Sequence, residues 1–285
     1  MSNLSMLFGI ETITHWLGST FNQFEVQIAV ALLLLGIYCC CRIAESLKPG
    51  GNLPPRFGWR WRVLTTTIAE LVLVLFFGLL FKSWCELSSL LSWGDNLGAV
   101  TGGFLTYFAA SFFFYWWHRI RHESDWLWRI FHQLHHSPQR LETMTTFYKH
   151  PAEVAGNSLI SAIITYLLFG LTVEGAMAYT AFTVAAQFFV HVNIKTPRWM
   201  GYFFQRPEMH RIHHQMDRHK NNYGDIVWWD MIFGTYENPA TFDGRCGFSD
   251  EREERLNDML LFKDVHKEHQ SSTSVTQSPQ RRYVA

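Results

Sequence analysis

Residues 97–122 read LGAVTGGFLTYFAASFFFYWWHRIRH, an apolar run that ends in two histidines. A helix that crosses a bilayer needs about 20 predominantly apolar residues, and residues 97–117 meet that need. His118 and His122 follow directly. Because residues four apart lie on one helical face, both imidazoles should point in the same direction. The stretch therefore predicts a membrane helix that carries a pair of histidines at one end.

Apolar runs elsewhere in the chain predict four more membrane helices. The five predicted spans are residues 24–41, 63–81, 97–117, 154–173 and 176–194. Only Glu174 and Gly175 separate the last two spans, which should therefore form a tight hairpin. Residues 4–21 are apolar but interrupted, and we expect a short interfacial helix there. The predicted fold is all-α, an integral membrane helical bundle.

The basic residues predict how the bundle is oriented in the membrane. Of the 24 Lys and Arg, five lie between the first two spans, five between the third and fourth, and thirteen after the fifth. Alternating spans put these 23 on one side, and only Lys82 lies opposite. Short loops rich in Lys and Arg face the cytosol, so the histidines should lie at the cytosolic face of a bacterial inner membrane or the endoplasmic reticulum. The first basic residue is Arg42, so we expect no cleavable signal peptide.

Composition narrows the class of protein and suggests three regions. Lys plus Arg equals Asp plus Glu, so no excess charge points to a nucleic-acid partner, and five cysteines give no disulfide framework. We expect N-terminal membrane helices in residues 1–96 and a catalytic region with three membrane helices and the histidines in residues 97–240. Residues 241–285 should be a cytosolic tail, disordered beyond about residue 270, where Ser, Thr, Gln and Pro dominate.

Eleven of the fourteen histidines fall between positions 118 and 219, and eight form three closely spaced groups. Neutral imidazole is a common protein ligand for iron, zinc and copper. Eight imidazoles exceed what one four- to six-coordinate ion can use, so the pattern predicts two ions. No H-E-x-x-H motif and no cysteine-rich zinc motif accompanies them. The grouped residues are His118, His122, His132, His135, His136, His210, His213 and His214.

Five stretches together resemble the fatty acid hydroxylase superfamily, which includes sterol desaturases and alkylglycerol monooxygenase. They are residues 115–122 (YWWHRIRH), 127–137 (LWRIFHQLHHS), 207–214 (PEMHRIHH), 222–225 (NYGD) and 229–235 (WDMIFGT). The resemblance implies a helical membrane bundle with a cytosolic cap and a histidine-ligated dimetal centre. It implies two iron ions, which zinc can replace in overexpressed protein, and O2-dependent hydroxylation or desaturation of a lipid. No electron-transfer domain is apparent, so a separate donor of cytochrome or ferredoxin type, with its reductase, is expected.

Carried over by position, the eight grouped histidines become metal ligands, and His191 becomes a ninth. Some fatty acid hydroxylases have a further histidine at the position of Gln187. With Gln187 there, this chain resembles the sterol desaturase and alkylglycerol branches instead. The resemblance also suggests His150 as a partner behind the ligands, whereas we expect His219 at the surface. Asp225 and Asp230 are either acceptors for imidazole N–H groups or residues that form caps and turns. We expect ordinary polar roles for His15, His266 and His269.

Two features inside the predicted spans bear on packing and on the site. Gly98, Gly102 and Gly103 have the small-residue spacing that lets helices approach closely. Glu70 is costly within a span, and it either faces a polar cavity or pairs within the bundle.

A metal transporter would place its ligands near the membrane midplane, whereas these lie beyond the span ends. A metal-stabilised scaffold without turnover remains the alternative to an oxygenase.

Overall fold

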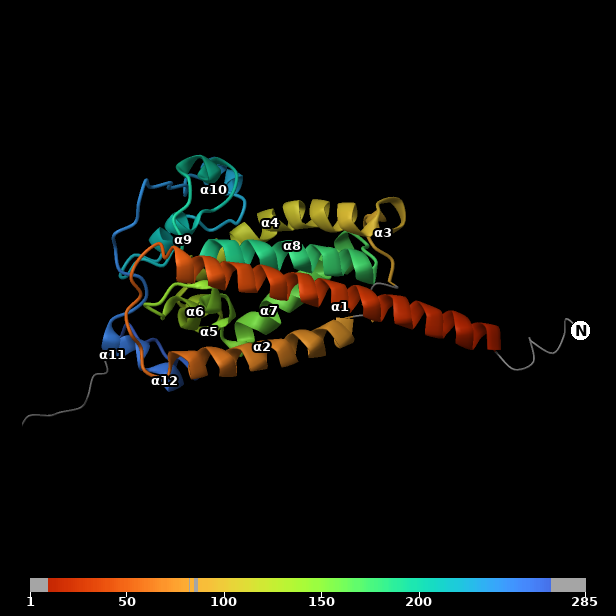
Figure 1. Cartoon of the computed structure of the whole chain (residues 1–285), viewed down its shortest axis with the longest axis horizontal. Coiled ribbons are helices and arrows are strands. Elements are labelled where there is room, and N and C mark those ends of the chain that lie inside the picture. Colours follow the sequence, from red (N-terminus) through yellow and green to blue (C-terminus); the bar gives the residue numbers. More distant parts are fainter. Residues whose placement is uncertain (1–9, 82, 85–86, 268–285) are drawn as a thin grey trace, which may run out of the picture.

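The computed structural model describes residues 10–81, 83–84 and 87–267, and within these ranges the chain is helical with no β-strand. Figure 1 shows the long helices side by side along one axis. This arrangement confirms the predicted all-α bundle. The long helices are α1 (Ile10–Leu47), α2 (Trp59–Phe81), α4 (Ala99–Glu123), α7 (Pro151–Ala162), which continues as the π-helix η3 (Ile163–Leu168), and α8 (Val173–His191).

Nine short helices connect and cover the bundle within the described ranges. Most of them gather at one end, on the left of Figure 1, whereas α3 lies at the opposite end. We call this gathering of short helices the end region. The short elements are α3 (Trp93–Asn96), α5 (Asp125–Phe131), α6 (Gln133–His136), η2 (Thr143–Phe147), η4 (Arg198–Tyr202), α9 (Pro207–His213), α10 (Trp228–Ile232), α11 (Asp250–Glu253) and α12 (Leu256–Leu260).

Four helical segments in the described chain are long and apolar enough to cross a membrane. They are Glu25–Leu47, Trp59–Phe81, Pro151–Leu168 and Val173–His191. Helix α4 is long enough but more polar, because Gly, Ser, Thr and Tyr interrupt its apolar residues, so the third span stays a prediction. The separate helix expected at residues 4–21 is wrong for its described part, since residues 10–21 continue directly into α1.

The turn between the last two spans lies earlier than the sequence suggested. We expected it at Glu174 and Gly175, but η3 ends at Leu168 and α8 begins at Val173. Gly170 has φ +61°, a conformation that glycine adopts without a Cβ clash, and the Thr172 hydroxyl caps α8 by accepting the Gly175 N–H at 3.2 Å. The end of the fourth span is therefore set by a turn that hydropathy does not reveal.

Helices α4 and α8 pack against each other at a glycine. A Cβ at Gly103 would lie 2.7 Å from both the Ala178 Cβ and the Tyr179 backbone nitrogen. The close approach predicted from small-residue spacing is confirmed at Gly103, whereas Gly98 has open space around its Cα. This contact fixes α4, which carries His118 and His122, against α8, which carries His191.

Part of the expected C-terminal tail is packed structure. Phe248, Met259 and Val265 are buried in one apolar cluster with Trp59 and Tyr148. The segment is polar on average, so its few aromatic and aliphatic residues did not indicate a packed structure. The disorder expected beyond about residue 270 falls outside the described residues, as do Lys82 and His269.

Candidate metal centre

All nine histidines proposed as ligands converge where α4, α6, α8 and α9 meet at the end region. Within each of two groups, the candidate ligand nitrogens lie within 4.8 Å of one another. All nine side chains are buried or half-buried. The five-histidine group is His118, His122, His132, His136 and His213, and the four-histidine group is His135, His191, His210 and His214.

In the five-histidine group, several buried ring nitrogens lie close together without a hydrogen-bond partner. The Nε2 atoms of His118, His122 and His213 are buried and have no hydrogen-bond partner, and the His132 and His136 Nε2 atoms are 3.1 Å apart. Buried polar nitrogens without partners are costly in a folded protein. A shared metal ion would satisfy these nitrogens, so the group fits a metal.

The four-histidine group has the same character. His191 Nε2 lies 3.3 Å from His135 Nε2 and 3.1 Å from His210 Nε2, and His210 Nε2 lies 3.1 Å from His214 Nε2. Since His191 and His135 both carry their proton on Nδ1, the contact between their Nε2 atoms has no hydrogen with which to form a hydrogen bond. Imidazole suits iron, zinc and copper, so this donor set also fits a metal ion.

The two groups share a wall. The rings of His136 and His214, one from each group, stack with centroids 4.0 Å apart and planes 11° apart. His132 and His135, three residues apart, are likewise neighbours from different groups, with ring centroids 5.4 Å apart. The spacing of H-x-x-H-H on α6 and α9 thus sends neighbouring histidines into adjacent groups.

Backbone carbonyls orient many of the imidazoles from behind. His118 Nδ1 donates to the Tyr223 carbonyl at 2.7 Å, and His213 Nδ1 donates to the Asn221 carbonyl at 2.7 Å. A carbonyl accepts only, so Nδ1 carries the proton and Nε2 is left to bind a metal. His191 and His135 have the same arrangement, with the Gln187 carbonyl at 2.8 Å and the Tyr148 carbonyl at 3.3 Å.

His132 is oriented by a carboxylate instead of a carbonyl. Its Nδ1 donates to Glu153 Oε1 at 3.0 Å, and Arg121 Nη1 donates to the same oxygen at 2.6 Å. Glu153 and Arg121 are 2% and 5% exposed, so this is a buried ion pair. Our sequence reasoning missed Glu153, although an acidic residue at the start of an apolar span is a usable signal.

Burial keeps the histidines neutral. It lowers the pKa of His213 to about 3. Burial and neighbouring imidazoles lower the pKa of His118 and His136 well below the usual value, and burial with the nearby Arg121 charge does the same for the pKa of His132. A metal ligand must be deprotonated, so these imidazoles are ready to bind at neutral pH.

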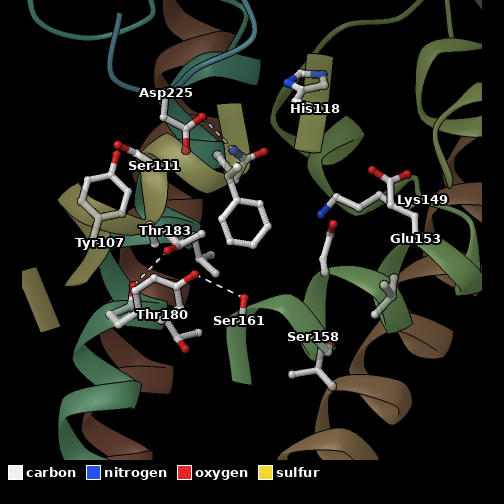
Figure 2. Close-up of a pocket in the computed structure, with 18 of the residues that line it drawn as sticks. Tyr107, Ser111, His118, Lys149, Glu153, Ser158, Ser161, Thr180, Thr183 and Asp225 are labelled. Carbon is white, nitrogen blue, oxygen red and sulfur yellow. Dashed lines mark hydrogen bonds between the residues drawn. The ribbon is translucent and has the colours of Figure 1, made fainter. Parts of the chain in front are cut away.

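A cavity of about 340 Å³ leads from the bundle to the histidines. Helices α2, α4, α7 and α8 line it, and His118, His132, His135 and His210 face its end. Figure 2 shows Lys149 and Glu153 on one wall, opposite Tyr107, Ser111 and Asp225. Apolar residues such as Val74, Phe77, Phe81 and Phe114 line much of the remainder.

The family model for fatty acid hydroxylases matches residues 103–235, the segment that holds all nine histidines. This segment belongs to the fatty acid hydroxylase family. Similar proteins include the ornithine lipid hydroxylase OlsE of Rhizobium tropici, at 34% identity over 134 residues, or 46% of this chain and 40% of that protein. Human alkylglycerol monooxygenase is 28% identical over 46% of this chain and 29% of its own length. The sphingolipid C4-hydroxylase sur2 of Schizosaccharomyces pombe is 26% identical over 48% of each chain.

The matched segment spans less than half the length of these relatives. No solved structure matches the chain. The family assignment and the four apolar segments together make the chain an integral membrane protein.

Two histidines of this fatty acid hydroxylase segment behave differently from expectation. His219 was expected at the surface, but it is half-buried, with its Nδ1 3.2 Å from His136 Nδ1. His150 was expected behind the ligands, but its Nδ1 caps α7 by accepting the Ala152 N–H at 3.0 Å, and its Nε2 lies 3.3 Å from the Leu260 carbonyl. A left-handed backbone at His219, with φ 44°, turns its ring inward and could not be read from the sequence.

Neither aspartate of the family motifs bonds directly to an imidazole. Asp230 accepts the backbone N–H groups of Tyr223 and Gly224 at 2.8 and 2.9 Å, so the turn-forming interpretation holds for it. Asp225 accepts the Gln187 side-chain amide at 2.9 Å. Both carboxyls are buried, which raises the pKa of each to about 6. Each aspartate instead bonds to a residue whose backbone carbonyl holds an imidazole. Asp230 bonds to Tyr223, whose carbonyl holds His118, and Asp225 bonds to Gln187, whose carbonyl holds His191.

His266 lies outside both groups, and its ring packs on Phe248 with centroids 4.4 Å apart. Its exclusion agrees with the ordinary polar role expected for it. His15 belongs to α1, and its ordinary polar role stays a prediction.

Proposed function

We propose that this protein is a membrane-bound di-iron oxygenase that hydroxylates an aliphatic carbon of a lipid with O2 and external electrons. The observation that carries the proposal is the pair of adjacent all-histidine groups at the end of a largely apolar cavity. The lipid hydroxylases and monooxygenase among the similar proteins support the same reaction class.

Each histidine group would hold one iron ion through its Nε2 atoms. Iron bound there would supply O2 activation and the oxidising power needed to attack an unactivated C–H bond. Zinc fits the same imidazoles, so overexpressed protein is expected to contain it in part.

The chain itself would orient the ligands and position the substrate. The Tyr223, Asn221 and Gln187 carbonyls fix three imidazole rings, and Glu153 fixes His132. The cavity walls hold the lipid chain at the histidines and keep water away from the reacting carbon. Hydroxylation is favoured over desaturation, because desaturation requires a second hydrogen to be placed equally close.

We also propose that the metal centre faces the cytosol, where a separate electron donor of cytochrome or ferredoxin type can reach it. The distribution of basic residues supports this orientation. Reporter fusions after Arg62 and Lys149 should read cytosolic. An external reading at either position would contradict the orientation.

A metal-binding scaffold is the alternative function, since ligands alone do not require turnover. The cavity favours an oxygenase, because a scaffold does not need a space that reaches the ligands. The test is incubation of membranes with 18O-labelled O2, NAD(P)H and a reductase system, followed by lipid mass spectrometry. Label in a lipid hydroxyl supports hydroxylation, and a new double bond without label indicates desaturation. A full iron complement without any O2-dependent lipid change, across lipid classes, would overturn the oxygenase proposal.

A further inference from the structure

The cavity is not uniformly apolar, and one polar part of its wall lies next to the histidines. Glu70 on α2 pairs with Lys149, with 3.1 Å between Glu70 Oε1 and Lys149 Nζ, and both line the cavity. Arg121 and Glu153 line it as well and form the second ion pair. We call these four residues the paired-charge wall. Since Glu153 also holds His132, this wall lies beside the metal end of the cavity.

Several atoms of the paired-charge wall have no hydrogen-bond partner. Glu70 Oε2, Glu153 Oε2 and Arg121 Nε are each buried and unpaired. Lys149 Nζ has one partner, the Glu70 carboxylate, although an ammonium group carries three donor hydrogens. Unmet hydrogen-bonding capacity at the three buried atoms is costly, and a polar group in the cavity would satisfy it.

The charges of the wall limit what that group can be. Each cation already has its own carboxylate, so no uncompensated positive charge is available for a phosphate or a fatty-acid carboxylate. The unpaired atoms are both acceptors, in Glu70 and Glu153, and donors, in Arg121 and Lys149. A hydroxyl or amide both donates and accepts, and it brings no net charge into the wall.

We propose that the paired-charge wall binds an uncharged hydroxyl- or amide-bearing part of the lipid substrate, close to the carbon that is oxidised. This inference rests on the proposed function only in taking the cavity as the substrate site. The substrate then places its neutral polar part beside the histidines, while its hydrocarbon chain follows the apolar walls formed by Val74, Phe77 and Phe81.

The test measures binding to zinc-loaded full-length protein without reductant, so that turnover plays no part. The four labelled probes each have a chain of sixteen carbons: 1-O-hexadecylglycerol, hexadecane, hexadecanoate and hexadecyl phosphate. The neutral diol should bind at least about tenfold more tightly than the other three, since a net hydrogen bond or two corresponds to about that factor. Comparable or tighter binding of the carboxylate or the phosphate would overturn the proposal.

The matched variant is E70Q/K149M, which keeps the net charge of the wall unchanged. It should weaken binding of hexadecylglycerol about tenfold and leave hexadecane binding as it is. The control is K48M/E174Q, which makes the same changes outside the cavity and should leave all four affinities unchanged. E70Q alone keeps one acceptor oxygen and should give a smaller loss, which serves if the double variant is unstable.

An unchanged affinity for hexadecylglycerol in both E70Q and the double variant would mean that the pair only holds α2 to the segment before α7. Equal losses for hexadecylglycerol and hexadecane would also refute recognition of the polar part. The binding test is independent of the oxygenase assay. Selective binding without 18O incorporation would contradict the proposed oxygenase function but would still support the binding of a neutral polar group.

Discussion

Replacing Glu153 by Leu tests how the structure holds one ligand of the five-histidine group. The change removes the carboxylate that accepts from His132 Nδ1 at 3.0 Å and from Arg121 at 2.6 Å. Arg121 is 5% exposed, so its charge would be left buried and unpaired. Breaking such a pair by removing one partner costs about 3–5 kcal/mol of stability. Losing the partner behind a metal-bound histidine typically lowers metal affinity about 10- to 100-fold.

A compensated variant separates these two effects. R121M/E153L removes both charges, and replacing a whole buried pair by apolar side chains is often neutral for stability. Its melting temperature in detergent should return close to that of the unchanged protein, while its metal affinity stays low because His132 Nδ1 still lacks an acceptor. E153Q should lie between, since an amide oxygen accepts the same hydrogen bond without the charge. Metal affinity is measured by competition with a chelator. Full affinity in R121M/E153L would refute the role of Glu153 in positioning His132.

Three further predictions follow from the same geometry. His213→Ala should abolish activity and lower the metal content measured by inductively coupled plasma mass spectrometry. His266→Ala, outside both groups, should retain activity and metal. Full metal content in the His213 variant would exclude His213 as a ligand. Gly103→Leu should destabilise the bundle by about 1–3 kcal/mol or more, because its side chain meets α8 at 2.7 Å, and Gly98→Ala should be tolerated; melting temperatures decide. In metal-free protein, the His213 pKa of about 3 lies below the unfolded value near 6.5, so its contribution to stability is complete above pH 6.5 and is lost as the pH falls towards 3, by up to about 1.4 kcal/mol per pH unit. A melting temperature independent of pH between 7.5 and 5.5 would contradict this assignment.

The fold class and the convergence of the nine histidines could be predicted, because both depend on spacing. Apolar runs give helices, and residues three or four apart share a face, so His132, His135 and His136 had to project from one short turn. Gln187 and Asp225 could both be recognised as positions in the family motifs, but the hydrogen bond between them could not be inferred from the sequence. The carbonyls behind His118, His213 and His191 were also beyond prediction, since every residue has a carbonyl and the sequence does not mark which one is used.

The sequence predictions that the structure contradicts concern positions where the local sequence pattern says little about the structure. The turn near Gly170 depends on backbone conformation, and the inward ring of His219 depends on a left-handed residue. The packed residues Phe248 and Met259 lie in a segment that is polar on average, and their burial depends on contacts with Trp59 and Tyr148, far away in the sequence. Such tertiary contacts leave no periodic pattern.

The division of the histidines between the two groups has a consequence for how the protein is made. The five-histidine group needs His213 and the four-histidine group needs His135, and helices α7 and α8 lie between these positions in the chain. Neither group is complete until the ribosome has reached His213 or His214 and both intervening helices have been inserted with their turn at the far side. Metal capture must therefore be a late step of biogenesis. An ion bound in either group would tie the first half of the chain to the second, so a molecule whose last hairpin inserted wrongly could not assemble either complete group.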